Sequence, residues 1–213
     1  MSEHAAAAHA HPDFVTPADW PEDPQYGKAT LGKLGMWIFL LSDALSFAGL
    51  LLAYGILRGG STHWHNPGEP ELGIPFTAGL TFLLICSSVT MVLGYAAAVE
   101  NKRKQATLFL GLTALGGVLF LCGQAHEYHG LSQEGLHFGA SAYASTFYVI
   151  TSFHGFHVFT GVTYLTIITI ATALGKFDNG NYNRIEVAGL FWHFVDLIWI
   201  LVFTFVYLVP TQK

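Results

Sequence analysis

Residues 34–57 read LGMWIFLLSDALSFAGLLLAYGIL, an apolar run with a single ionisable side chain, Asp43. A helix needs about 20 mostly apolar residues to cross roughly 30 Å of hydrocarbon, so this run is long enough to span a membrane. Four more stretches meet the same criterion: residues 74–99, 107–125, 142–174 and 185–209. The sequence therefore predicts an all-α integral membrane protein, a bundle of five transmembrane helices.

The composition of the 213-residue chain agrees with that architecture. Hydrophobic residues make up 52% of it and charged residues 11%, whereas a soluble domain carries about 25% charged residues. So few charges could not cover a globular surface in water. The 15% aromatic content argues against intrinsic disorder, and the two cysteines argue against a disulfide scaffold. A net charge of −5 argues against nucleic-acid binding, which needs a basic surface.

The first 33 residues differ from the rest of the chain. They are acidic, rich in His and Ala and interrupted by proline, and they lack the basic start and apolar centre of a signal peptide. We expect a flexible tail over residues 1–33 and one membrane domain over residues 34–213. The tail histidines, and His63 and His65 around Trp64, are a weak metal signal, so no metal site is predicted. Trp64 is expected at the lipid headgroups.

The basic residues predict how the bundle is oriented. Five spans place the two termini on opposite sides of the membrane. Two basic residues lie on the C-terminal side, Arg58 and Lys213, against seven on the N-terminal side: Lys28, Lys33, Lys102, Arg103, Lys104, Lys176 and Arg184. Because basic residues concentrate in cytoplasmic loops, we expect a cytoplasmic N-terminus and a periplasmic or external C-terminus.

Ionisable side chains inside a span are costly and are therefore functional candidates. Asp43 lies nine residues into the first span. It must be protonated, hydrogen-bonded by Ser42 or Ser46, or turned toward a polar crevice. Two interpretations stay open: a carboxyl that packs helices, and a carboxyl that handles protons or binds a lipid headgroup.

Glu127 ends the third predicted span beside Gln124, His126 and His129. The cluster is expected near a membrane interface, where water can reach it. Either a solvated helix end or a functional carboxyl fits this position.

The fourth span carries His154 and His157, whose spacing puts both imidazoles on one helix face. Hydrogen bonding in the core is the favoured interpretation, because a metal or haem would need further ligands from other helices. Gly155 and Gly161 predict close helix packing.

The fifth span repeats this spacing with His193 and Asp196, flanked by Trp192 and Trp199. An Asp three residues after a His can hydrogen-bond the imidazole, so we expect a His193–Asp196 pair, which either ties helices together or serves function. The second span carries hydroxyls that can bond within or between helices: Ser87, Ser88 and Thr90.

Four ordered stretches resemble a known family. Residues 191–199 (FWHFVDLIW) closely resemble the signature of subunit III of the haem-copper respiratory oxidases. Three other stretches agree in order and spacing: residues 35–43 (GMWIFLLSD), residues 124–128 (QAHEY), and one longer stretch with 145–148 (STFY) followed by 154–158 (HGFHV) and Gly161. The resemblance covers residues 33–209. Larger members have seven spans, so this chain resembles the short five-span form found in many bacteria.

The resemblance implies a non-catalytic subunit of a proton-pumping terminal oxidase in the bacterial inner membrane. Subunit I of that family holds the haems and copper, reduces oxygen and pumps protons. Subunit III packs directly against subunit I, in a complex with subunit II, binds phospholipid but no redox centre, and supports proton uptake and durability. No catalytic or metal-ligating residue is expected in this chain. The candidate proton- or lipid-related residues are Asp43, Glu127, His154, His157, His193 and Asp196.

The electron donor stays open between cytochrome c and quinol. Many cytochrome c oxidases have Glu where this chain has Asp43, and the ending VFTFVYL at residues 202–208 resembles bo-type quinol oxidases. Two other functions remain as alternatives. One is a haem-binding membrane anchor with axial ligands among His126, His154, His157 and His193. The other is a small proton-coupled transporter built on Asp43, Glu127 and Asp196.

Overall fold

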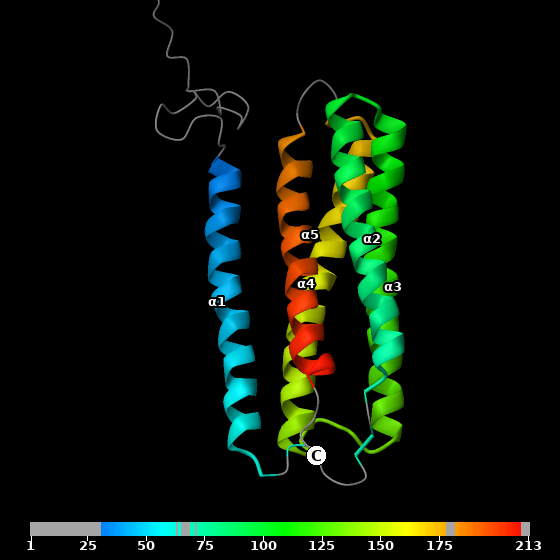
Figure 1. The fold of residues 1–213 in the computed structure, drawn as a ribbon. Helices are drawn as coiled ribbons and strands as arrows, with labels where there is room; N and C mark the ends of the chain where they lie inside the picture. Colours follow the sequence, from blue (N-terminus) through cyan, green and yellow to red (C-terminus); the bar gives the residue numbers. More distant parts are fainter. Residues whose placement is uncertain (1–30, 63, 65–68, 71, 178–181, 210–213) are drawn as a thin grey trace, which may run out of the picture.

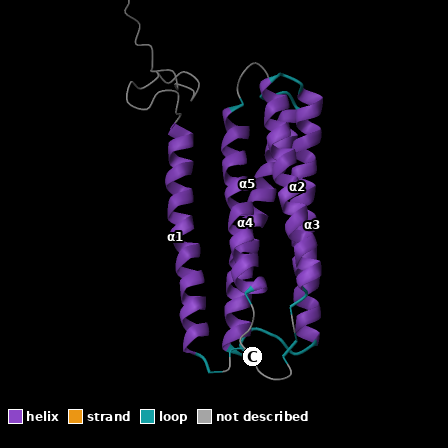
Figure 2. Ribbon diagram, viewed as in Figure 1, coloured by secondary structure: helices purple, strands orange, loops and turns teal. Residues whose placement is uncertain are grey.

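The computed structural model describes residues 31–62, 64, 69–70, 72–177 and 182–209. This part of the chain forms the helices α1 (Leu31–Gly60), α2 (Ile74–Val99), α3 (Arg103–Gln133), α4 (Ala142–Ala173) and α5 (Asn183–Val202). A π-helical turn, η1 (Phe203–Leu208), extends α5 (Figures 1 and 2). Five helices are long and apolar enough to cross a membrane, which confirms the predicted all-α, five-span architecture.

Several helices extend beyond the predicted apolar runs, by the largest margin at the end of α3. The apolar run of α3 ends at residue 125, but the helix continues to Gln133, because polar side chains in its last turns find partners inside the bundle. Helix α1 begins at Leu31, within the stretch predicted as tail. The rest of the tail lies outside the described residues, and so do His63, His65 and Lys213.

Local sequence signals set the helix ends. Ser141 caps α4, because its Oγ accepts a hydrogen bond from Ala144 N at 3.0 Å. Gly135 and Gly175 follow α3 and α4 with φ of +91° and +74°, a left-handed conformation that glycine adopts without steric cost. The N–H of the residue after each glycine returns to a carbonyl of the last turns, which closes the helix.

The helices differ in how much of their surface the bundle covers. In the most apolar part of each span, 56% of residues are buried in the α5 span and 17% in α1. Figure 1 shows α1 beside the bundle formed by the other four helices. Helix α5 is thus the central element, and α1 is a peripheral one that needs specific contacts to stay in place.

Polar contacts hold α1 at both of its ends. Near its start, Lys33 Nζ lies 2.7 Å from Glu186 Oε2 in the first turn of α5. Near its end, the Arg58 guanidinium donates to the Val209 carbonyl at 3.4 Å. A third polar contact, at the middle of the helix, belongs to the candidate site. These contacts hold α1 to α5, to α4 and to the residue after η1.

Trp64 packs within the bundle, at the end where α1 stops. It is 6% exposed, and its ring lies 5.3 Å from that of Tyr54 and 6.0 Å from that of Tyr143, both edge to face. Two aromatic partners on α1 and α4 enclose its side chain. The expectation that Trp64 lies at the depth of the lipid headgroups stays a prediction.

Glycine lets α3 and α4 approach α5 closely. A Cβ added at Gly117 would lie 2.4 Å from Val162 and 2.5 Å from Trp192, and one at Gly161 would lie 3.0 Å from Trp192. A Cβ at Gly155 would meet nothing within 4 Å. The close packing expected at Gly161 is present, and that expected at Gly155 is absent, because Gly155 points into open space.

Gly117→Ala should destabilise the bundle, because the new methyl group would overlap side chains on both α4 and α5. Overpacking a well-filled core costs about 1–3 kcal/mol. Gly155→Ala is the matched control and should leave stability unchanged or raise it, since alanine favours helices over glycine. Thermal unfolding of the purified protein measures both. Equal transition temperatures for the two variants would contradict the packing described.

The orientation of the bundle stays a prediction with a direct test. Protease access or reporter fusions should place residues 102–104 and 176–184 in the cytoplasm and residue 213 on the opposite side, as the positive-inside bias requires. A reporter at residue 213 that is active in the cytoplasm would contradict the expected topology.

Candidate functional site

The two tryptophans of the FWHFVDLIW stretch fasten α5 to α2. Trp192 Nε1 donates to Ser87 Oγ at 3.0 Å, and Trp199 Nε1 donates to Thr81 Oγ1 at 2.9 Å. Both rings are at most 1% exposed. Residues seven apart share a helix face, so one face of α5 meets a row of hydroxyls on α2. An indole N–H buried this deeply requires such a partner.

Asp196 belongs to the same contact and makes no hydrogen bond to His193. Its Oδ2 accepts a hydrogen bond from Ser88 Oγ at 2.7 Å, and its Oδ1 is buried without a hydrogen-bond partner among the described residues. The expected His193–Asp196 hydrogen bond is thus replaced by a bond to α2. The two side chains are helix neighbours with an electrostatic interaction between them, but the Asp196 carboxyl is held by the Ser88 hydroxyl on α2.

Asp43 and His157 make the polar contact at the middle of α1. Asp43 Oδ1 lies 3.2 Å from His157 Nε2 on α4, and His157 Nδ1 donates to the Phe153 carbonyl at 2.7 Å. Both side chains are 8% exposed. Asp43 lies about 18 Å from the start of α1 at 1.5 Å per residue, so the pair lies deep in the hydrocarbon.

The Phe153 carbonyl determines where the protons of this pair lie. A carbonyl oxygen only accepts, so one proton of His157 is on Nδ1. A contact of 3.2 Å between Nε2 and Oδ1 requires another proton between them. Either Asp43 is a carboxylic acid that donates to neutral imidazole, or it is a carboxylate that accepts from imidazolium. The pair is neutral overall in both states, which suits a site inside a membrane.

The expected partners of Asp43 on its own helix are engaged elsewhere. Ser42 donates to the Phe39 carbonyl at 2.8 Å, and Ser46 donates to the Ser42 carbonyl at 3.2 Å. Both hydroxyls are exposed on α1. A helical serine can always bond to the turn before it, and for that reason the partner of Asp43 comes from another helix.

His154 is enclosed by aromatic rings. It is 0% exposed, its ring lies 4.9 Å from Trp199 and 5.8 Å from Phe120, and neither ring nitrogen has a hydrogen-bond partner. Within the part of the chain that the structure describes, the expected core hydrogen bond of His154 is therefore absent. No three His, Cys, Asp or Glu side chains of the described residues are grouped as metal ligands would be.

Glu127 is the centre of a second buried cluster. Its Oε2 accepts from Tyr207 Oη at 3.0 Å and from Gln124 Nε2 at 3.2 Å, and its Oε1 lies 2.8 Å from Thr77 Oγ1. The carboxyl is 7% exposed. Helices α2 and α3 and the turn η1 thus meet at one acidic side chain.

Hydrogen-bond counting indicates that Glu127 is a neutral acid. Thr77 Oγ1 also lies 3.1 Å from the Gly73 carbonyl, and the hydroxyl has one proton for two oxygens. A proton on Glu127 Oε1 satisfies both contacts, because the acid then donates to Thr77 while Thr77 donates to Gly73. Every hydrogen-bond partner of the carboxyl is then satisfied, and no charge is buried.

Two members of this cluster are exposed and two are buried, and access of water to it stays a prediction. His126 and His129 are exposed, whereas Gln124 and Glu127 are buried. The helix continues beyond Glu127. The segment therefore has one buried face and one exposed face, and it is not a frayed, solvated helix end. Sequence reasoning did not find Thr77 or Tyr207 as partners, since both come from other elements.

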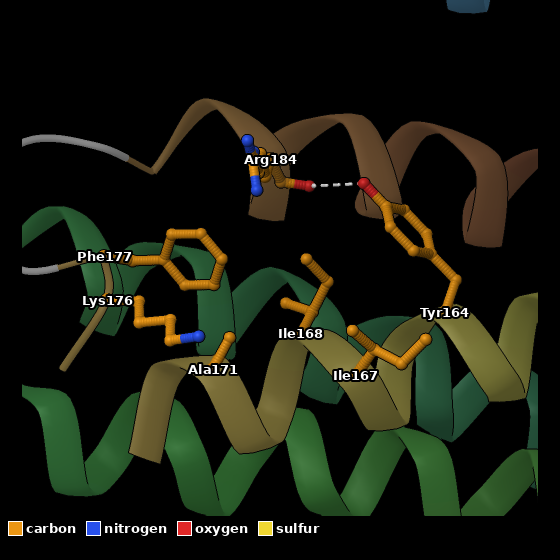
Figure 3. A pocket seen from close by; sticks show the side chains of 7 residues that line it. All are labelled: Tyr164, Ile167, Ile168, Ala171, Lys176, Phe177 and Arg184. Carbon is orange, nitrogen blue, oxygen red and sulfur yellow. Dashed lines mark hydrogen bonds between the residues drawn. The ribbon is translucent and has the colours of Figure 1, made fainter. Parts of the chain in front are cut away.

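A pocket of about 730 Å³ lies between α4 and α5, at the end of the bundle where α4 stops. Figure 3 shows the basic side chains of Lys176 and Arg184 on its α4 and α5 sides, and Tyr164 Oη donating to the Arg184 carbonyl at 3.5 Å. The remaining lining is apolar: Ile167, Ile168, Ala171 and Phe177. The pocket therefore combines two cationic side chains with an apolar lining.

Comparison with known proteins places this geometry in a family. The family described as cytochrome c oxidase subunit III matches residues 27–210. The chain belongs to this family. The match includes all five spanning helices and both buried acid clusters, and it confirms the resemblance found in the FWHFVDLIW stretch.

The relatives of this subunit III chain include subunits of oxidases named for cytochrome c and of an oxidase named for ubiquinol. The cytochrome c oxidase subunit 3 of Synechocystis sp. is 36% identical over 184 residues, which are 86% of this chain and 78% of the relative. That of Thermostichus vulcanus is 35% identical, over 94% of this chain and 90% of its own. The cytochrome bo(3) ubiquinol oxidase subunit 3 of Pseudomonas aeruginosa is 33% identical, over 82% and 83%.

Membership in the family has two direct consequences. The chain is subunit III of a cytochrome c or quinol oxidase, and it acts in a complex with other oxidase subunits. With five helices able to span a membrane, it is a multi-pass bacterial membrane protein. The buried acids and histidines are thus to be understood as parts of a respiratory subunit.

Proposed function

We propose that this subunit sustains oxygen reduction in a partner subunit rather than performing it. Haem and copper belong, on this proposal, to the partners, with subunit I in direct contact and subunit II in the same complex. The buried imidazoles of this chain do not suit a haem: His154 and His157 lie on one helix, and both nitrogens of His157 are engaged. A haem held by two histidines needs them on facing helices.

The observation that carries the proposal is the neutral Asp43–His157 pair. A proton shared between a carboxyl and an imidazole can move from one to the other without changing the net charge of the pair, so no isolated charge is left in the membrane. The pair also ties peripheral α1 to α4. It therefore supports two of the proposed roles, proton uptake near the partner and stability of the complex.

Asp43→Asn separates these two roles. The amide N–H of asparagine can donate to His157 Nε2, so the tie between α1 and α4 should persist, while the ionisable group is lost. We expect a normally assembled oxidase with a near-normal initial rate that loses activity sooner during turnover. Asp43→Leu, which loses the hydrogen bond as well, should also assemble poorly. An Asn variant with unchanged rate, proton pumping and lifetime would show that Asp43 only packs.

The pocket between α4 and α5 supports the proposed role in binding phospholipid. Lys176 and Arg184 can neutralise a phosphate, and the apolar wall can accept acyl chains. Replacing both basic residues with Gln should reduce the anionic phospholipid that remains with the complex in native mass spectrometry, by about one molecule per subunit. Replacing the exposed Lys104 is the control, since it lies outside the pocket. Unchanged lipid in the double variant would exclude this pocket as a lipid site.

A further inference from the structure

Helix α5 has one face that the other described residues leave uncovered. His193, Leu197, Ile200 and Thr204 lie along it, at the spacing of one helix stripe. Leu197 and Ile200 are 56% and 40% exposed, Thr204 is exposed and His193 is half-buried. Figure 1 shows α5 between α1 on one side and α2 on the other. The uncovered face is therefore an apolar strip interrupted by one imidazole.

His193 lies at a depth where neither water nor a lipid headgroup can satisfy it. It is about 15 Å from the start of α5 at 1.5 Å per residue, in a hydrocarbon layer of roughly 30 Å. An imidazole carries a donor or acceptor at each nitrogen. Within the described residues His193 makes no hydrogen bond, and the carboxyl of Asp196, the charged group that interacts with it, is bonded to Ser88. Acyl chains have no polar atoms to offer.

We propose that a transmembrane helix of a neighbouring oxidase subunit docks on this strip and presents a hydroxyl, amide or indole group to His193. The proposal rests on the membership of the chain in an oxidase complex. The strip supplies the apolar contact, and the imidazole supplies a polar point that fixes the depth of the partner helix. Thr204 adds no second polar point, because its hydroxyl donates to the Ile200 carbonyl at 2.7 Å.

Photo-crosslinking in the intact oxidase tests what occupies the strip. A benzophenone amino acid at position 197 should form an adduct with a side chain of another oxidase subunit, identified by mass spectrometry. The same probe at Leu108, an exposed position on α3 (59%), sets the background of lipid adducts. Adducts of position 197 with lipid alone, or with a second copy of this chain, would overturn the proposal.

His193→Leu tests the polar point separately. It keeps the apolar strip and removes the hydrogen bond, so the subunit should dissociate from the complex about three- to tenfold more readily as detergent is raised. His193→Gln offers a donor and an acceptor and should restore retention to within about twofold. Retention of the Leu variant equal to that of the unaltered chain would overturn the role of the imidazole. Failure of the supporting role in catalysis would appear instead in turnover lifetime, with retention unaffected.

Discussion

Glu127→Ala should destabilise the subunit by about 3 kcal/mol or more, the largest effect that we expect of any single change. Removing the carboxyl leaves Tyr207, Gln124 and Thr77 without their shared partner. Each buried polar group left unsatisfied costs about 1–3 kcal/mol, although groups inside a membrane bundle find some alternative partners. Thermal unfolding of the purified complex in detergent measures the loss.

Glu127→Gln is the matched control and also tests the protonation state. An amide can donate to Thr77 and accept from Tyr207 and Gln124, as a neutral acid does, so the cost should stay below about 1 kcal/mol. Infrared spectra should lose one band of a protonated carboxylic acid in this variant. A Gln variant as unstable as the Ala variant would mean that Glu127 is ionised.

Breaking the Asp43–His157 pair from one side should cost about 3 kcal/mol, because the remaining group stays buried without its partner. The variants are Asp43→Ala and His157→Ala, and the double variant should cost less than the sum of the two. The measurement is the thermal stability of the assembled complex. Strict additivity would show that the two side chains do not interact.

The sequence predicts the architecture well and the pairing of side chains less well. Five apolar runs suffice for five helices, because the length of a span and its composition are local properties. The end of α3 was placed too early, since hydrophobicity decreases before Glu127 while tertiary hydrogen bonds keep the helix going. Where contacts with other elements stabilise a helical segment, the local sequence does not reveal how far the helix extends.

The same distinction explains the outcome at the candidate site. Spacing places Trp192, Asp196 and Trp199 on one face correctly, but it does not say which helix that face meets. The pairing of His193 with Asp196 failed for this reason, and Ser88 took its place. The sequence offers Asp43 only Ser42 and Ser46 as named partners beside a protonated state or a polar crevice, whereas its partner His157 lies more than a hundred residues away in sequence.

Preparing the oxidase from membranes that lack this subunit tests the central claim most directly. We expect the haem spectrum of the remaining complex to persist and oxygen consumption to begin at a substantial rate. Activity should then decay during turnover faster than in the complete complex, and adding the subunit back should restore its lifetime. Loss of the haem spectrum without the subunit would contradict the account, because the chain would then be needed to build the catalytic centre.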